Sequence, residues 1–146
     1  MNSVLAVCIS ENKGETKTPV PTITLRENYG VISDAHADSE THRQVSLLAM
    51  ESIDKMQGKG IVLKPGDFAE NITTEGIDLT ALPVGTRLEV GQTLLEMSQI
   101  GKECHAGCAI RDQVGDCIMP REGIFAKVIR GGEIKAGDTL TIVNND

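Results

Sequence analysis

Apolar and polar residues alternate with the spacing of strands over most of the chain. In residues 3–10 (SVLAVCIS), successive side chains would point to opposite faces of a strand, and neither face is strongly polar. This pattern predicts a buried strand. A polar segment with one glycine and two prolines follows at residues 12–21 (NKGETKTPVP) and indicates a loop. Residues 22–34 (TITLRENYGVISD) then predict one or two further strands.

The spacing becomes helical in one segment. Val45, Leu48, Ala49, Ile53 and Met56 recur at three- and four-residue intervals, and glycines follow at positions 58 and 60. This pattern predicts a helix over residues 45–56. Its start is open, because the letters QVSLL also suit an extended strand.

From residue 61 onward the pattern is again that of strands. A glycine followed by Asp or Thr and then by alternating apolar residues occurs three times, in KPGDFAENI (64–72), PVGTRLEV (83–90) and KAGDTLTI (135–142). Each predicts a turn that leads into a strand. Gly91-Gln92 is expected to form the turn of a hairpin, and residues 123–144 are expected to form two strands joined by a glycine-rich connection. Together these elements predict a mainly β fold, a closed or partly open β-barrel with one or more short helices, as a single domain over residues 1–146.

Composition and charge narrow the functional classes. The chain carries 14 basic and 21 acidic residues, for a net charge of −7, and only three aromatic residues. An acidic surface repels phosphate backbones and few rings are available for base stacking, so we expect no nucleic acid partner. No apolar run is long enough for a membrane span or a signal peptide, so we expect a cytoplasmic protein with reduced thiols and no membrane partner.

Three of the four cysteines lie close together. Cys104 and Cys108 stand in IGKECHAGCAI (100–110) beside His105, and Cys117 follows. A disulfide is not expected in a reducing compartment. A closed zinc site usually combines two pairs of closely spaced cysteines or histidines, and this sequence has only one such pair. Lys102 and His105 place positive charge beside Cys104, which favours a reactive thiolate, whereas burial as small apolar residues suits Cys8 and Cys117. A reactive Cys104, a zinc site and a purely structural role stay open on the residues alone.

Two further polar clusters precede the cysteines. Residues 33–44 (SDAHADSETHRQ) contain His36 and Arg43, and they are either a solvated loop or a pocket in which the planar guanidinium binds an oxyanion. Residues 65–73 (PGDFAENIT) contain Glu70 and Asn71 and form a third polar cluster, which on the residues alone fits a turn followed by a strand, with polar side chains that cap the turn.

These three clusters, in this order, resemble the MOSC domain, the C-terminal domain of molybdenum cofactor sulfurases. The resemblance extends over DAHADSETHRQVSLL, LKPGDFAENITTEGIDLTALPVGTRLEVG and IGKECHAGCAI, and thus over nearly the whole chain. Cys104 aligns with the single cysteine of the family. The sequence departs from the family at Ser33 and Asp38, where glycine is usual, and in the letters FAEN, where FGEN is usual. Cys108 and Cys117 are additional to the family cysteine, and either could resolve or protect Cys104.

The resemblance implies a barrel similar to the small barrel of pyruvate kinase and a role with the molybdenum cofactor. It implies that Cys104 carries sulfur as a persulfide and contacts molybdenum, with Cys108 as a further candidate metal ligand. It implies cofactor binding by side chains of the three clusters, namely His36, Arg43, Glu70, Asn71, Lys102 and His105.

The expected partners are a cysteine desulfurase and proteins that make or accept the molybdenum cofactor. Full-length sulfurases have a pyridoxal phosphate domain for which this chain has no room, so we expect the stand-alone bacterial form without that cofactor, and no zinc. Two other functions stay open, a molybdenum-dependent oxidoreductase component that reduces N-hydroxylated compounds and a non-catalytic module that binds the cofactor. A structural zinc-binding β domain is the remaining alternative, and whether the chain is catalytic stays open.

Overall fold

The computed structural model of this chain describes residues 2–10, 17–32, 34, 44–54, 65–66, 70–100 and 123–143. The strands in these ranges are β1 (Ser3–Ile9), β2 (Thr18–Val20), β3 (Thr22–Arg26), β4 (Gly30–Val31), β5 (Val45–Ala49), β6 (Ile72–Glu75), β7 (Arg87–Val90), β8 (Thr93–Ile100), β9 (Ile124–Arg130), β10 (Gly132–Lys135) and β11 (Leu140–Val143). A short helix, α1, covers Met50–Asp54, and a single 3-10 turn covers Leu79–Ala81.

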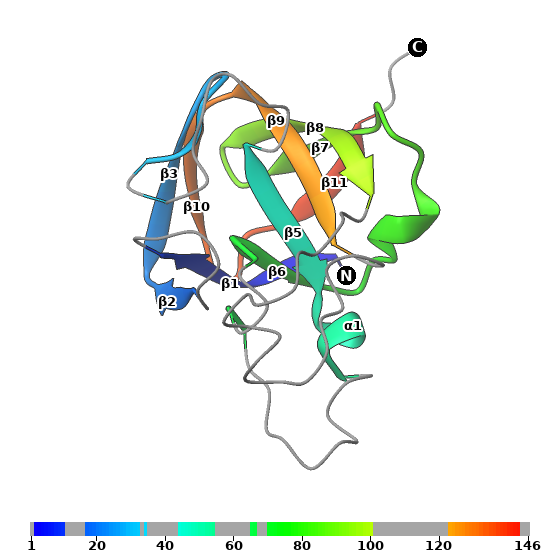
Figure 1. The fold of residues 1–146 in the computed structure, drawn as a ribbon, viewed down its shortest axis with the longest axis horizontal. Coiled ribbons are helices and arrows are strands. Elements are labelled where there is room, and N and C mark those ends of the chain that lie inside the picture. Colours follow the sequence, from blue (N-terminus) through cyan, green and yellow to red (C-terminus); the bar gives the residue numbers. More distant parts are fainter. Residues whose placement is uncertain are drawn as a thin grey trace, which may run out of the picture.

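The strands form two sheets. The larger sheet has eight strands in the order β11-β7-β8-β9-β5-β6-β1-β2, and the smaller has three in the order β10-β3-β4. β5 and β6 are parallel, and the other pairs are antiparallel. Figure 1 shows the larger sheet curving strongly, with β3 and β10 standing along one side of it.

The larger sheet is not closed into a continuous barrel. β1 and the chain just before β11 are joined by the bridge between Ser3 and Thr139 and by hydrogen bonds from Val4 N to Asp138 O and from Gly137 N to Val4 O, each 2.8 Å long. These contacts replace a full ladder between β1 and β11. The predicted mainly β fold with a closed or partly open barrel is therefore confirmed in its partly open form.

One hydrophobic core lies between the two sheets. Its buried residues come from the larger sheet and also from β3, β4 and β10 of the smaller one, including Ile23, Leu25, Val31 and Ile134. Strands of the smaller sheet alternate as expected for one buried face; in β3, Ile23 and Leu25 are buried and their neighbours are exposed. Apolar burial from both sheets makes the core continuous.

The helix predicted over residues 45–56 is wrong in its first half. Val45–Ala49 is strand β5, which lies between β6 and β9 with all five residues buried, and the described residues Met50–Asp54 form helix α1. A strand buried on both faces shows no alternation, so its apolar residues can match helical spacing by chance.

The turn predictions agree with the structure. Val90 pairs with Thr93 across Gly91-Gln92, and Gly91 has a φ of 56°, as the hairpin required. Gly66, Gly85 and Gly137 all have positive φ angles, and strands β6, β7 and β11 follow them. Residues 123–143 contain three strands where two were expected, because the chain leaves β9 at Gly131-Gly132 to pair β10 with β3 and then returns to the larger sheet as β11.

Candidate functional site

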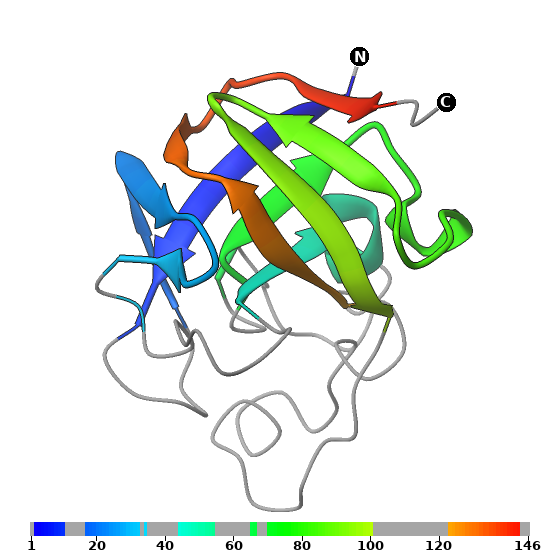
Figure 2. The ribbon, with the colours of Figure 1, turned by 90° about the horizontal axis from the view of Figure 1, so that it is seen from above.

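A row of paired residues crosses the larger sheet and relates the three predicted clusters to one another. Ile100 at the end of β8 pairs with Ile124, Ile124 with Leu47, Leu47 with Ile72, and Ile72 with Val7. The end of β8 and the starts of β9, β5 and β6 lie on the same side of the molecule in Figure 2. At this row the end of β8 and the starts of β9 and β6 meet, while β5, which is antiparallel to β9, begins two residues away at Val45.

Asn71 joins three strands at this row. It precedes β6, and its side-chain Oδ1 accepts hydrogen bonds from Ser46 N of β5 at 3.0 Å and from Ser46 Oγ at 3.2 Å. Its Nδ2 donates to the carbonyl oxygen of Cys8 in β1 at 3.2 Å, and the Cys8 N–H donates to Asn71 O. Asn71 is fully buried, so these bonds fix the starts of β5 and β6 and the end of β1 relative to one another.

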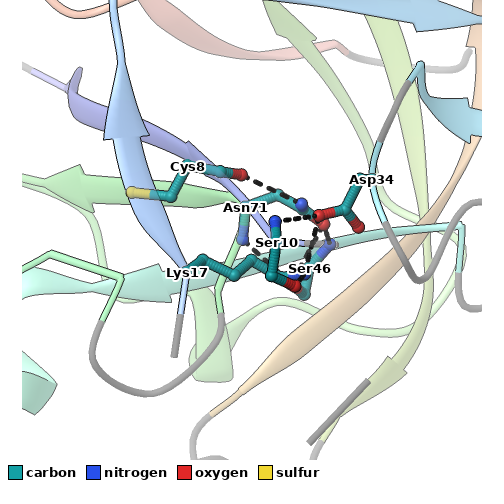
Figure 3. A network of polar contacts seen from close by, with 6 residues as sticks. All are labelled: Cys8, Ser10, Lys17, Asp34, Ser46 and Asn71. Carbon is teal, nitrogen blue, oxygen red and sulfur yellow. Dashed lines mark hydrogen bonds and ion pairs between the residues drawn. The ribbon is translucent and has the colours of Figure 1, made fainter. Parts of the chain in front are cut away.

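A buried ion pair lies beside Asn71 (Figure 3). Lys17 Nζ is 2.7 Å from Asp34 Oδ1, and neither side chain is accessible to solvent. Lys17 Nζ also donates to Ser10 Oγ, and Asp34 Oδ1 accepts a second hydrogen bond from Ser10 N, both at 3.0 Å. The pair thus joins the end of β1, the residue before β2 and the chain after β4.

Glu70 holds the turn that precedes β6. Its Oε2 accepts hydrogen bonds from Gly66 N at 3.1 Å and from Thr73 Oγ1 at 2.7 Å, and the residue is fully buried. The carbonyl oxygen of Gly66 accepts a hydrogen bond from Lys17 N at 2.7 Å. The turn at Gly66 is therefore bonded on one side to Glu70 and on the other to Lys17.

Gln44, the residue just before β5, is fixed by hydrogen bonds of its side chain and its backbone. Its Nε2 donates to Asn28 Oδ1 at 2.9 Å, its Oε1 accepts from Val128 N at 3.0 Å, and its backbone N–H donates to Ala126 O. Gln44 is fully buried, and Asn28 lies in the turn between β3 and β4 with a φ of 52°. Asp34 and Gln44, the residues on either side of 35–43, are thus both hydrogen-bonded inside the protein.

Of the predicted site residues, the structure describes Glu70 and Asn71 and brings them into one buried network. The other predicted residues lie outside the described part of the chain: His36, Arg43, Lys102, Cys104, His105 and Cys108, and with them Cys117. Among the described residues no group of three or more His, Cys, Asp or Glu side chains could hold a metal ion. Cys8 is fully buried, as predicted for a small apolar residue.

The described side chains Glu70 and Asn71 are better suited to support a cofactor site than to line it. The carboxylate and amide oxygens of Glu70 and Asn71 accept hydrogen bonds from the protein's own backbone and hydroxyl groups. A molybdenum cofactor carries a phosphate, for which the guanidinium of Arg43 and the imidazole of His36 are fitting donors. Arg43, which precedes Gln44, and His36, two residues after Asp34, therefore stay the predicted ligands of that phosphate.

The sequence patterns did not identify Lys17, Ser10, Gln44 or Ser46 as members of this network. Lys17 lies in a polar, proline-containing segment whose composition indicates only a loop. Its buried partner Asp34 is 17 residues away. No local signal marks such a pair, because only the folded chain brings its members together.

Comparison with known proteins identifies the family. A model of the MOSC domain matches residues 26–141, and the chain belongs to the MOSC domain family. MOSC domains are generally related to the molybdenum cofactor. A search of curated proteins found no match.

Solved structures with the same fold include two named bacterial proteins. The crystal structure of the YuaD protein from Bacillus subtilis superposes with a TM-score of 0.77 at 18% identity, covering 100% of this chain and 98% of that one. YiiM from Geobacillus stearothermophilus gives 0.74 at 19% identity, covering 99% and 76%, and YiiM from Escherichia coli gives 0.72 at 18% identity, covering 100% and 71%. At these identities the likeness establishes the fold. In the part of the chain that the structure describes, no helix is long and apolar enough to cross a membrane.

Proposed function

We propose that this protein binds the molybdenum cofactor and carries sulfur as a persulfide on Cys104 for delivery to a metal–sulfur centre. The observation that carries the proposal is the buried network around Asn71 and the Lys17–Asp34 pair. Through Lys17, which pairs with Asp34 and donates its N–H to Gly66 O, it joins the two chain segments in which the family resemblance places cofactor ligands, residues 34–44 and 65–71. A support of this kind favours ligand binding, because donors held in advance lose little conformational freedom when a ligand binds.

The cofactor would be held by side chains that the chain attaches directly to this support. Arg43 precedes Gln44, and His36 is two residues after Asp34. Arg43 offers a planar pair of donors for a phosphate, and His36 offers one further donor. Glu70 and Asn71 would act indirectly, because they hold the turn at Gly66 and the start of β6.

Sulfur transfer through Cys104 needs two thiol–persulfide exchanges, one that loads Cys104 and one that unloads it. The Cys104 thiolate attacks the outer sulfur of a persulfide on a cysteine desulfurase, an S–S bond forms at Cys104, and the desulfurase thiolate leaves. A thiolate of the receiving protein then attacks the outer sulfur on Cys104 and regenerates the Cys104 thiolate. Neither exchange consumes an oxidant or reductant, and the two electrons that release the sulfur as sulfide at the metal centre would come from a thiol reductant, which is converted to a disulfide. Lys102 and His105 supply positive charge that favours the Cys104 thiolate.

Intact mass spectrometry tests the carrier role. The protein is incubated with a cysteine desulfurase and cysteine, and the expected product is one added sulfur atom, absent in Cys104→Ala. Cys8→Ala is the matched control, because Cys8 is fully buried and should leave the added mass unchanged. An added sulfur that persists in Cys104→Ala would disprove the assignment of Cys104 as the carrier.

Metal analysis separates this proposal from the alternatives. We expect substoichiometric molybdenum in the protein purified from cells supplied with molybdate, since a carrier passes its cargo on. Stoichiometric molybdenum that is lost in Cys104→Ala would instead support an oxidoreductase component. Stoichiometric zinc would support a structural zinc site, and cofactor binding without any sulfur transfer would support a non-catalytic binding module.

A further inference from the structure

We propose that Lys17 is a positioning residue that couples the two segments of the cofactor site. Its side chain holds Asp34, from which residues 35–43 continue, and its backbone holds the turn at Gly66, which leads to Glu70 and Asn71. The inference rests on the proposed function for what the two segments bind. The coupling itself depends only on contacts within the protein.

The side chain of Lys17 makes the first half of the connection. Its ammonium group is completely buried, 2.7 Å from Asp34 Oδ1 and 3.0 Å from Ser10 Oγ. Ser10 N donates to the same Asp34 oxygen, so the carboxylate is held from two directions. Figure 3 shows the Lys17 side chain extending toward Ser10 and Asp34 while Asn71 lies directly beside them.

The backbone of Lys17 makes the second half. Lys17 N donates to Gly66 O at 2.7 Å, and a Cβ atom added at Gly66 would overlap the carbonyl oxygen of Lys17. The two backbones are therefore in direct contact with no room for a side chain between them. Gly66 N in turn donates to the buried Glu70 carboxylate at 3.1 Å.

A charge is not needed here for stability alone. Replacing a buried ion pair by apolar residues of similar volume is often neutral or stabilising, whereas removal of one partner leaves an uncompensated charge. An ion pair differs from apolar packing in that its geometry is directional, since the ammonium and the Ser10 N–H both point at one carboxylate oxygen. The pair therefore orients the chain at Asp34, which packing alone would not do.

Amide hydrogen exchange followed by NMR tests the coupling without any cofactor. In Lys17→Met we expect exchange to become about tenfold faster or more at Ser10, on the Asp34 side, and at Gly66, on the Glu70 side. Exchange at Leu95 in the middle of β8 should change less than at these two amides. Lys135→Met, at an exposed lysine of β10, is the matched control and should change neither. Unchanged exchange at Gly66 in Lys17→Met would overturn the coupling.

The double variant Lys17→Met/Asp34→Leu separates positioning from stability, and it also serves if Lys17→Met alone fails to fold. Its urea midpoint should lie above that of Lys17→Met, because no buried charge is left unpaired, and below that of the wild type, because Ser10 N loses its bond to Asp34. Its affinity for molybdenum cofactor released from a purified molybdoenzyme should nevertheless fall about tenfold or more, because Asp34 no longer orients residues 35–43. Full affinity in the double variant would refute the positioning role.

Failure of the proposed function and failure of the positioning role of Lys17 give different results. A wild-type protein that neither binds the released cofactor nor gains sulfur on Cys104 would refute the proposed function. The exchange rates at Ser10 and Gly66 would still decide whether Lys17 couples the two segments. Normal cofactor binding by the wild type and by the double variant would refute only the role of Lys17.

Discussion

At the scale of single residues, this protein uses buried polar side chains to hold segments of the chain together. Asn71, Glu70 and Gln44 are fully buried. Asn71 and Gln44 bind backbone groups of segments distant in the sequence, and Glu70 binds the backbone of the turn just before it. Buried polar groups are costly unless they are bonded, so each one fixes a defined arrangement of the chain around it.

Asn71→Ala should destabilise the protein strongly. It removes the acceptor of Ser46 N and a donor to Cys8 O in a buried position, and the expected loss in the free energy of unfolding is about 2–4 kcal/mol. Urea denaturation followed by circular dichroism measures this loss. Asn2→Ala is the control, with an expected change of less than about 0.5 kcal/mol. Equal effects of the two substitutions would contradict the role of the Asn71 side chain.

Cys8 should be unreactive in the native protein. Its side chain is fully buried in β1, and alkylation needs an accessible thiolate. Brief treatment with N-ethylmaleimide followed by peptide mass mapping should find Cys8 unmodified, and the same treatment in guanidinium should modify it. Rapid native labelling of Cys8 would show that β1 opens locally and that Cys8→Ala is not a silent control for the sulfur-transfer assay.

The residue scale is also where prediction from the sequence was weakest. The motif FAEN drew attention to Glu70 and Asn71, but nothing in the letters around Lys17 distinguishes it from a solvated lysine. Its burial depends on Asp34 and on the turn at Gly66, which reach it only in the folded chain. Lys102, Cys104 and His105 were assigned from the family resemblance and their local charges, and their roles stay predictions.

At the scale of elements, local turn chemistry was more informative than apolar spacing. The glycines that predicted turns do precede strands, because a positive φ is a local requirement that few other residues meet. The helix over residues 45–56 failed because β5 is buried on both faces, which is a property of the sheet and not of the segment. Of the later part of that segment, the described residues Met50–Asp54 are helical and bury Ile53.

Gly66→Ala should cost far more than the same change in an equivalent turn. Gly66 has a φ of +93° and its missing Cβ would overlap Lys17 O, whereas Gly137 has a φ of +95° with nothing within 4 Å of that position. Gly137→Ala therefore carries only the conformational cost, about 1 kcal/mol. Gly66→Ala adds the displacement of Lys17, and we expect a total of at least about 3 kcal/mol.

Differential scanning calorimetry of the two glycine variants measures the contrast. The melting temperature should fall by several degrees more in Gly66→Ala than in Gly137→Ala, since about 1 kcal/mol corresponds to roughly 2–5 °C in a chain of this size. Similar decreases would mean that the turn at Gly66 can move away from Lys17 at little cost, which would also weaken the proposed coupling.

At the scale of the whole molecule, two sheets share one core. The apolar cluster includes residues of β3, β4 and β10 as well as residues of the larger sheet, although the two sheets are not joined by a strand ladder. The mainly β architecture followed from the sequence, because turn residues and alternation recur along the chain. The division into two sheets did not, since it depends on the bend at Gly131-Gly132 that takes β10 across to β3.

A shared core predicts that damage to the smaller sheet unfolds the whole molecule. Ile134 of β10 is fully buried, so Ile134→Ala should lower the free energy of unfolding by about 2–5 kcal/mol. Ile142 of β11 is 43% exposed, and Ile142→Ala should cost less than about 1 kcal/mol. Urea titration with circular dichroism, and NMR intensities of amides in β8 and β3, should give one coincident transition for each variant. If Ile134→Ala instead melted β3 at lower urea than β8, the two sheets would be separate cooperative units, and Asn28, in the turn after β3, would not hold Gln44 and the start of β5 as firmly as the site requires.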